Sequence, residues 1–237
     1  MDGYERERNG LMAQIAAVAA ETARATGLRA FDARVMAAMG TVPRHEFVLP
    51  ADRPFAWSNQ PLPIRFSQTI SQPFIVALMT QLLALDPEDH VLEVGTGCGY
   101  QTAVLATLAR HVYSIELEPE LAASAAARLE RLGYHNVDIR TGDGAKGWPE
   151  TSPFDAVIVT ACAREVPPAL VAQLRPGGRL VLPLTTPTGQ ELMLIEKGRD
   201  DGDLETKPND LPLTVRSVLR VAFVPLRQQR EDDALLN

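Results

Sequence analysis

The sequence predicts an α/β protein, a doubly wound α/β/α sandwich built on a mostly parallel sheet of about seven strands. Over residues 86–197, short β-branched runs alternate with Ala- and Leu-rich helical patterns, which is typical of βαβ units. A glycine-rich turn joins the first of these runs to a helical pattern, and an acidic residue ends the second. Residues 1–85 combine helical patterns with a proline-rich stretch and predict a helical extension before the sheet.

Strands are expected wherever β-branched runs are bounded by turn residues. In chain order these runs are residues 91–94, 112–116, 137–141, 156–160, 179–183 and 191–197, followed by a last strand at 217–226, expected to be antiparallel. A helix is expected at 100–109. Another is expected between Pro119 and Gly133, because proline suits a first helical turn and glycine a helix end. Residues 198–213 are polar and predict a loop, and a polar tail follows the last strand.

Composition argues against several classes of partner. The net charge is −7, and an acidic chain lacks the electrostatic footprint of most nucleic-acid-binding proteins. No apolar run approaches the roughly 18 residues that a membrane span needs, and the N-terminal segment lacks the positive region of a signal peptide. A cytoplasmic protein without nucleic-acid or membrane partners is therefore expected. A monomer is also expected, although composition does not determine the oligomeric state.

Cysteine and histidine usage argues against disulfides and metals. The two cysteines, Cys98 and Cys162, do not form a disulfide framework, and they favour a reducing compartment. The four histidines show no ligand spacing such as H-x-x-x-H, so no metal site is predicted.

A glycine-rich turn at residues 93–99, Glu-Val-Gly-Thr-Gly-Cys-Gly, follows the first strand of the sheet. Glycines let the backbone pass close to a ligand, and a helix N-terminus supplies unpaired N–H donors. Glu116, at the end of the second strand, is expected to accept hydrogen bonds from both ribose hydroxyls, as in dinucleotide sites. Because strand, turn, helix and distal acid agree, we expect a nucleoside-containing cofactor. A turn that merely connects a strand to a helix remains the alternative.

The glycine spacing distinguishes among cofactors. A dinucleotide fingerprint, G-x-G-x-x-G, needs glycine where Tyr100 stands, and no G-x-x-x-x-G-K-[ST] phosphate loop is present. The pattern E-x-G-x-G-x-G instead resembles the first motif of class I methyltransferases. This resemblance implies a Rossmann-like core that binds S-adenosyl-L-methionine and releases S-adenosyl-L-homocysteine. The residues expected at the cofactor are Glu93, Gly95, Thr96, Gly97, Gly99, Glu116, Leu117, Gly142, Asp143, Gly144, Thr160 and Ala161.

Two later turns complete the expected cofactor site. Asp143, in the Gly-Asp-Gly sequence after the third strand, is expected to accept a hydrogen bond from the adenine amino group, although Gly-Asp-Gly is also ordinary turn chemistry. The turn at residues 160–162, after the fourth strand, is expected to border the methionine moiety.

Several segments carry a closer resemblance. They are Val-Pro-Arg-His-Glu-Phe-Val at residues 42–48, Pro-Leu-Pro-Ile at 61–64, Gln-Thr-Ile-Ser-Gln-Pro at 68–73, and later segments at 132–137, 147–149, 153–156 and 223–226. Through them the chain resembles the protein-L-isoaspartate O-methyltransferases from about residue 40 to 226. The block at 68–73 is specific, because other class I methyltransferases do not share it.

The resemblance implies methyl transfer to the free carboxylate of L-isoaspartyl residues in damaged proteins or peptides, whose methyl ester collapses to a succinimide and so begins repair. In that family the serine of the 68–73 block, here Ser71, is the catalytic residue, and Thr69 is a second candidate. Ser71 could alternatively be only the N-cap of the following helix. No general base is needed, because a carboxylate with a pKa of about 4 is ionised at neutral pH.

The pattern along the chain also predicts how it is organised. Residues 1–85 are expected to cap the site as a helical and loop extension, and residues 86–237 to form the S-adenosylmethionine-binding core, together as one continuous domain. Two departures put the substrate range in question: Arg65-Phe66-Ser67 replaces the family's Gly-x-Gly, and Cys162 replaces an alanine.

Three other functions stay open. A specialised aspartate O-methyltransferase that modifies a dedicated peptide would keep the cofactor and change the client. A nicotinamide-dependent oxidoreductase is disfavoured by Tyr100. A non-catalytic S-adenosylmethionine sensor is separated from an enzyme only by a turnover assay.

Overall fold

A computed structural model describes residues 3–199 and 211–228 of the chain. The helices are α1 (Glu5–Thr26), α2 (Ala33–Thr41), α3 (Pro73–Leu83), α4 (Tyr100–Ala106), α5 (Pro119–Arg131) and α6 (Pro168–Ala172). The strands are β1 (Leu62–Pro63), β2 (Thr69–Ile70), β3 (His90–Val94), β4 (His111–Glu116), β5 (Val137–Thr141), β6 (Phe154–Val159), β7 (Leu174–Thr186), β8 (Gly189–Lys197) and β9 (Leu213–Val221). Short 3₁₀ turns occupy η1 (Arg44–Glu46), η2 (Pro50–Phe55), η3 (Gly144–Lys146) and η4 (Pro149–Thr151).

The central sheet has seven strands in the order β5-β4-β3-β6-β7-β8-β9, which confirms the predicted fold class. The strands from β5 to β7 run parallel. The last strand is not the reversed one, contrary to expectation: β8 pairs antiparallel with both β7 and β9. The reversed strand of the sheet is therefore β8, and β9 runs in the direction of the parallel strands.

The predicted end of the last strand is wrong. The sequence predicts this strand at residues 217–226, whereas β9 spans Leu213–Val221. Beyond it the chain leaves the sheet and crosses to the turn after β6, where Cys162 forms an isolated bridge with Pro225. Proline has no N–H to donate to a ladder, which suits a segment outside the sheet. Most of the predicted loop at 198–213, and the tail after residue 228, lie outside the described residues.

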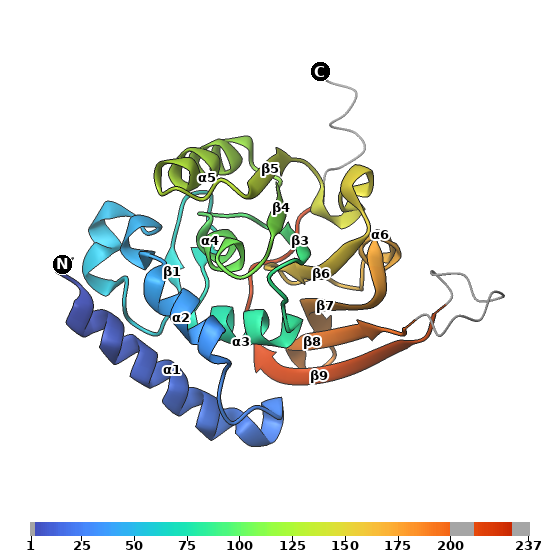
Figure 1. The fold of residues 1–237 in the computed structure, drawn as a ribbon, viewed down its shortest axis with the longest axis horizontal. Coiled ribbons are helices and arrows are strands. Elements are labelled where there is room, and N and C mark those ends of the chain that lie inside the picture. The colour runs from blue at the N-terminus through green and yellow to red at the C-terminus, as the bar shows by residue number, and fades with distance from the viewer. Residues whose placement is uncertain (1–2, 200–210, 229–237) are drawn as a thin grey trace.

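Helices cover both faces of the sheet (Figure 1). On one face, α3 packs against β6 and β7, while α4 and α5 pack against β4 and β5, with α1 and α2 lying outside α3. On the other face α6 packs against β7. Because side chains alternate along a strand, Val91 joins the core under α1–α5, whereas Leu92 and Val94 join the second core.

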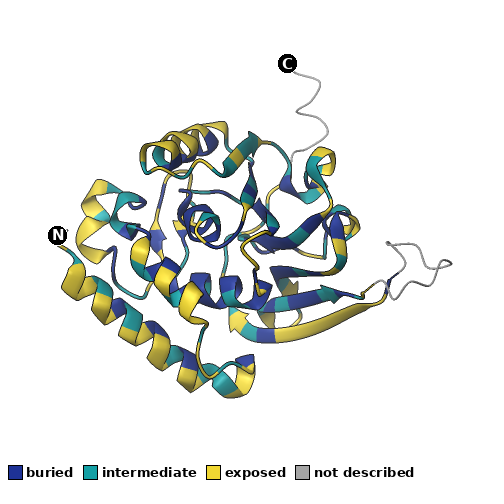
Figure 2. Ribbon diagram, viewed as in Figure 1, coloured by how far each residue is buried: buried dark blue, intermediate teal, exposed yellow. Residues whose placement is uncertain are grey.

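The observed helix ends follow local sequence signals. α5 begins at Pro119 and stops shortly before Gly133, whose φ of +85° suits glycine. α4 is shorter than predicted, ending at Ala106 rather than residue 109. Buried residues fill the central strands β3 and β6 and the inner faces of the helices, whereas most of the edge strand β9 and the outer faces of α1 and α5 are exposed (Figure 2). Among the described residues, no helix is long and apolar enough to cross a bilayer. The division at residue 85 stays a prediction.

Candidate active site

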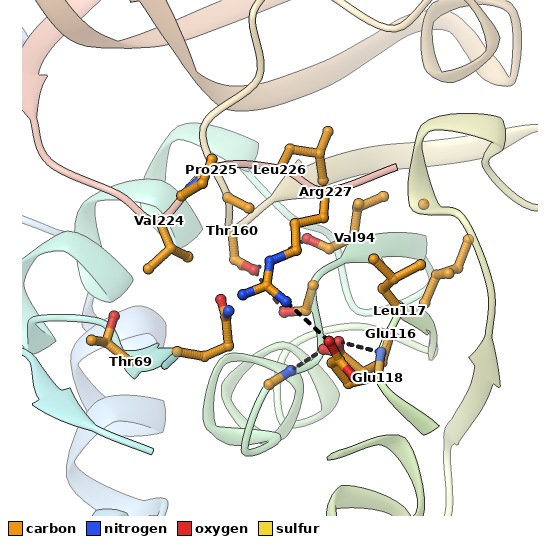
Figure 3. Close-up of a pocket in the computed structure, with 16 residues that line it drawn as sticks. Thr69, Val94, Glu116, Leu117, Glu118, Thr160, Val224, Pro225, Leu226 and Arg227 are labelled. Carbon is orange, nitrogen blue, oxygen red and sulfur yellow. Dashed lines mark hydrogen bonds and ion pairs between the residues drawn. The ribbon is translucent and has the colours of Figure 1, made fainter. Parts of the chain in front are cut away.

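A pocket opens at the carboxyl ends of β3, β4 and β6, where parallel α/β sheets usually bind ligands (Figure 3). It contains about 620 Å³ of empty space, part of it open to solvent. The lining residues are Gln68, Thr69, Val94, Gly95, Gly97, Ile115, Glu116, Leu117, Glu118, Gly144, Thr160, Ala161, Val224, Pro225, Leu226 and Arg227.

Gly95 directly follows β3 and lies against Thr160, which directly follows β6. The φ of Gly95 is +98°, and a Cβ at this position would lie 2.4 Å from the Thr160 Oγ1 atom. That hydroxyl donates to the Gly95 carbonyl at 2.6 Å. Any side chain at Gly95 would displace Thr160, so the turn requires glycine for both its conformation and its space.

Glu116 binds the glycine-rich turn from the end of β4. Its Oε2 accepts a hydrogen bond from the Gly97 N–H at 2.7 Å, and its Oε1 accepts one from the Glu118 N–H at 3.0 Å. Two backbone donors therefore fix the carboxylate at the pocket wall. Each carboxylate oxygen can accept further bonds, so ligand hydroxyls can still bind there.

Glu93 lies beneath the turn and does not line the pocket. It is fully buried, and its Oε2 accepts hydrogen bonds from the hydroxyls of Thr102 at 2.5 Å and Ser114 at 2.6 Å. The Ser114 hydroxyl also bonds that of Thr96 at 2.6 Å. Burial raises the pKa of Glu93 to about 8 despite these two bonds. The side chain therefore carries a proton at neutral pH and supports the turn from behind.

Of the predicted site residues, the pocket brings together eight: Thr69, Gly95, Gly97, Glu116, Leu117, Gly144, Thr160 and Ala161. Glu93, Thr96, Gly99, Gly142, Asp143 and Ser71 do not line it. Gly99 is the N-cap of α4 with a φ of +88°, and a Cβ there would lie 3.3 Å from Leu129 Cδ1. Asp143 accepts a hydrogen bond from the Ala145 N–H at 3.0 Å, so one of its oxygens is used within its own turn. A Cβ at Gly144 would lie 2.3 Å from Val94 Cγ1.

Ser71 lines a second cavity, between α1, the loop before α3 and the end of β9. That cavity is lined by Val18, Thr22, Pro61, Thr69, Ser71, Gln72, Phe74, Ile75, Leu219, Arg220, Val221, Ala222 and Phe223. Thr69 lines both cavities, so they adjoin at this residue. The alternative that Ser71 is an N-cap is wrong, because the N-cap position of α3 is Gln72 and makes no side-chain cap. The Asn59 side chain instead accepts from the Phe74 N–H at 3.0 Å.

The segment at residues 222–228 supplies pocket residues that sequence reasoning missed. It crosses the turn after β6, where the Cys162 N–H donates to the Val224 carbonyl and the Leu226 N–H to the Cys162 carbonyl, both at 2.8 Å. Arg227 points across the pocket toward Glu118 (Figure 3). Residues 223–226 are among the segments that carry the family resemblance, and this is the sequence signal that the segment belongs to the site.

A short hairpin places Gln68 and Thr69 at the pocket. β1 and β2 pair antiparallel, and the Gln68 N–H donates to the Arg65 carbonyl at 3.2 Å to close the turn. Phe66 and Ser67 have φ values of +59° and +56°. Positive φ at both central residues is the pattern of a type I′ turn, which favours glycine. Phe66 and Ser67 therefore adopt a turn conformation that favours glycine, although both carry side chains.

No cluster of three or more His, Cys, Asp or Glu side chains suited to a metal ion occurs within residues 3–199 and 211–228.

The seven-stranded sheet and the glycine-rich turn paired with an acidic residue on the next strand define the class I methyltransferase architecture. Comparison with known proteins narrows the class. The chain belongs to the protein-L-isoaspartate(D-aspartate) O-methyltransferase (PCMT) family, whose sequence model matches residues 20–231.

Curated relatives share about half of the sequence. Protein-L-isoaspartate O-methyltransferase 1 of Polaromonas sp. (strain JS666 / ATCC BAA-500) is 56% identical over 91% of this chain and 87% of its own length. Protein-L-isoaspartate O-methyltransferase 1 of Cupriavidus necator is 51% identical, over 95% and 83% respectively.

Solved structures agree on the fold. A protein-L-isoaspartate O-methyltransferase superposes with a TM-score of 0.73 at 26% identity, covering 92% of this chain; this chain spans 65% of that protein. A β-aspartate methyltransferase (PCMT) from Plasmodium falciparum, solved with S-adenosyl-L-homocysteine, superposes with a TM-score of 0.73 at 21% identity over 97% of this chain and 100% of its own.

Proposed function

We propose that this chain transfers a methyl group from S-adenosyl-L-methionine to the free carboxylate of L-isoaspartyl residues in damaged proteins or peptides, which initiates repair through a succinimide. The observation that supports this most is the meeting of two cavities at Thr69. One is the pocket that is lined by the glycine-rich turn and by Glu116, which suits a nucleoside. The other is an open, largely apolar groove that is lined in part by Ser71.

The residues of the first cavity fit S-adenosyl-L-methionine. Glu116 accepts the ribose hydroxyls, since its carboxylate is already oriented by two backbone donors. Gly95, Gly97 and Gly144 keep the pocket wall free of side chains. Thr160 and Ala161 border the methionine moiety, and Asp143 retains one oxygen for the adenine amino group. When bound, the cofactor supplies an electrophilic methyl group on a sulfonium.

The substrate side needs orientation more than acid–base chemistry. An aspartyl-type carboxylate, with a pKa of about 4, is ionised at neutral pH and needs no proton removed. Ser71 binds and orients the acceptor, and Thr69 contacts both partners where the cavities adjoin. The rate enhancement comes from holding nucleophile and methyl carbon in line while the surrounding segments exclude water.

The proposal also covers the roles of the two parts of the chain, the location of the protein and its partners. Residues 1–85 supply the hairpin and α3 on the substrate side, and residues 86–237 form the cofactor-binding core. The protein acts as a cytoplasmic monomer on peptides and proteins, without a nucleic-acid partner or a metal.

The decisive experiment uses methyl-labelled S-adenosyl-L-methionine and two peptides that differ only in isoaspartate versus aspartate, with base-labile methyl ester as the readout. Label on the isoaspartyl peptide alone supports repair. Label on neither peptide, with S-adenosyl-L-homocysteine still bound, refutes generic repair. It would favour a specialised aspartate methyltransferase with a dedicated client, for which the side chains at Arg65, Phe66 and Ser67 are the specific observation.

A further inference from the structure

The arginine of the 42–48 segment has no place in the chemistry described so far. Arg44 begins η1 and is fully buried. Its Nε donates to the Ala56 carbonyl at 3.0 Å, and its Nη2 donates to the Ser71 carbonyl at 2.8 Å. Its guanidinium carbon lies 4.6 Å from the ring centroid of Tyr100. The third nitrogen, Nη1, is buried without a hydrogen-bond partner.

This burial is costly, which calls for an explanation beyond packing. A buried guanidinium normally pairs with a carboxylate, because an uncompensated charge in the interior is strongly unfavourable. Within the described parts of the chain, Arg44 makes no ion pair, and its charge is offset by two carbonyl dipoles and by the neighbouring Tyr100 side chain. An apolar side chain of similar length would avoid the cost of burying a charge, but it could not donate hydrogen bonds to the Ala56 and Ser71 carbonyls.

The contacts of Arg44 join the two sides of the site. Ser71 lines the substrate groove. Tyr100 is the first residue of α4 and directly follows the glycine-rich turn. Tyr100 is itself fixed by an edge contact with Phe47, at 5.6 Å between ring centroids. One rigid, planar group thus ties the Ser71 backbone to the element that begins at the cofactor turn.

We propose that Arg44 is a positioning residue that fixes the Ser71 backbone relative to the cofactor turn, so that the acceptor carboxylate and the methyl group meet in line. The inference rests on the proposed function, in which Ser71 orients the acceptor. Lysine cannot replace it fully, because an ammonium lacks the planar fork that donates in two fixed directions while stacking on a ring. A small displacement of a positioning contact can cost about a hundredfold in rate.

The test compares Arg44→Met and Arg44→Lys with Arg34→Met. Arg34 is a matched control because it also donates to two carbonyls, those of Leu85 and Leu108, both at 3.0 Å, but it does not line either cavity of the site. Rates on an isoaspartyl peptide are divided by the concentration of S-adenosyl-L-homocysteine-binding sites, so that unfolded protein does not count. We expect kcat/KM to fall about 10- to 100-fold in the Arg44 variants, while their affinity for S-adenosyl-L-homocysteine stays unchanged. Arg34→Met should keep wild-type kinetics. If Arg44→Met does not fold, Arg44→Lys carries the comparison.

A double-mutant cycle with Ser71→Ala separates positioning from stability. If Arg44 acts through Ser71, its substitution should have little further effect on kcat/KM in the Ser71→Ala background. An equal loss in both backgrounds, or wild-type kcat/KM per binding site in the Arg44 variants, overturns the inference. Neither of these two results would refute the proposed function. The proposed function fails only if the wild-type protein does not methylate the isoaspartyl peptide.

Discussion

Arg227 and Glu118 form an ion pair across the mouth of the cofactor pocket, with 3.0 Å between Nη1 and Oε1. The two residues lie 109 positions apart in the sequence. Glu118 follows β4 just beyond Glu116, whereas Arg227 belongs to the segment that leaves β9. Both residues line the pocket, so the pair connects its two rims (Figure 3).

Breaking this pair should speed cofactor exchange. Both side chains are partly exposed, and such pairs contribute about 0.2–1 kcal/mol. Arg227→Met is therefore expected to raise the dissociation rate of S-adenosyl-L-homocysteine about two- to fivefold, measured by stopped-flow displacement at low salt. Arg110→Met, which removes an exposed pair with Glu88 away from the pocket, is the control. Equal rates in wild type and Arg227→Met would show that the pair does not limit exchange.

Gly144 should not tolerate a methyl group. In Gly144→Ala the new Cβ would lie 2.3 Å from Val94 Cγ1, and both residues line the pocket. Overpacking of this kind costs about 1–3 kcal/mol, and we expect the loss in urea unfolding together with weaker S-adenosyl-L-homocysteine binding by calorimetry. Gly10→Ala is the matched control, because Gly10 lies within α1 with no neighbour within 4 Å of the added Cβ. It should gain stability, by up to about 1 kcal/mol. A stable Gly144→Ala with normal affinity would contradict the placement of Val94.

The parts of the fold that could be predicted carry their signal locally. The run at 137–141 is bounded by turn residues and matches β5 in full, and Gly95 and Glu116 were identified because strand, turn and acid lie within one short stretch. The end of β9 could not be predicted in this way. It depends on pairing with β8, from Lys197 opposite Leu213 to Gln190 opposite Val221, which is a tertiary relationship.

The site likewise combines residues that local sequence predicts with residues that depend on the tertiary path of the chain. Arg227 reaches the pocket only because the chain crosses the turn after β6, and no local sequence pattern predicts that path. Glu93 is the first residue of the glycine-rich motif and is predicted to contact the cofactor, yet it lies beneath the glycine-rich turn. Its burial follows from the alternation of side chains along β3, which faces it away from the pocket-lining Val94.

The protonated state of Glu93 should make stability depend on pH. Its pKa is raised to about 8 in the folded protein by burial, whereas the unfolded chain ionises near 4.5. Between these values the folded state holds a proton that the unfolded state has lost, so this group destabilises the fold as pH rises. The contribution is at most about 1.4 kcal/mol per pH unit and levels off above the folded pKa.

Glu93→Gln tests this dependence, because glutamine keeps an acceptor for Thr102 and Ser114 but does not ionise. The free energy of unfolding of the wild type should fall relative to the variant between about pH 5 and pH 8, and the difference should then become constant. Denaturant unfolding at each pH measures it. Parallel curves for the two proteins across that range would mean that Glu93 ionises normally in the fold.

Ser67→Gly should stabilise the hairpin beside the pocket. Ser67 has a φ of +56°, a left-handed conformation that costs a side-chain residue about 1–2 kcal/mol. Glycine removes that cost but loses about 0.5–1 kcal/mol of unfolded-state entropy, so we expect a net gain of up to about 1 kcal/mol in thermal or urea unfolding. Ser67→Ala, which has the same backbone restriction as serine, should give none. If glycine and alanine shift stability equally, the turn is not strained. If Ser67→Gly also changes the preference among isoaspartyl peptides while leaving cofactor affinity unchanged, the hairpin takes part in substrate selection.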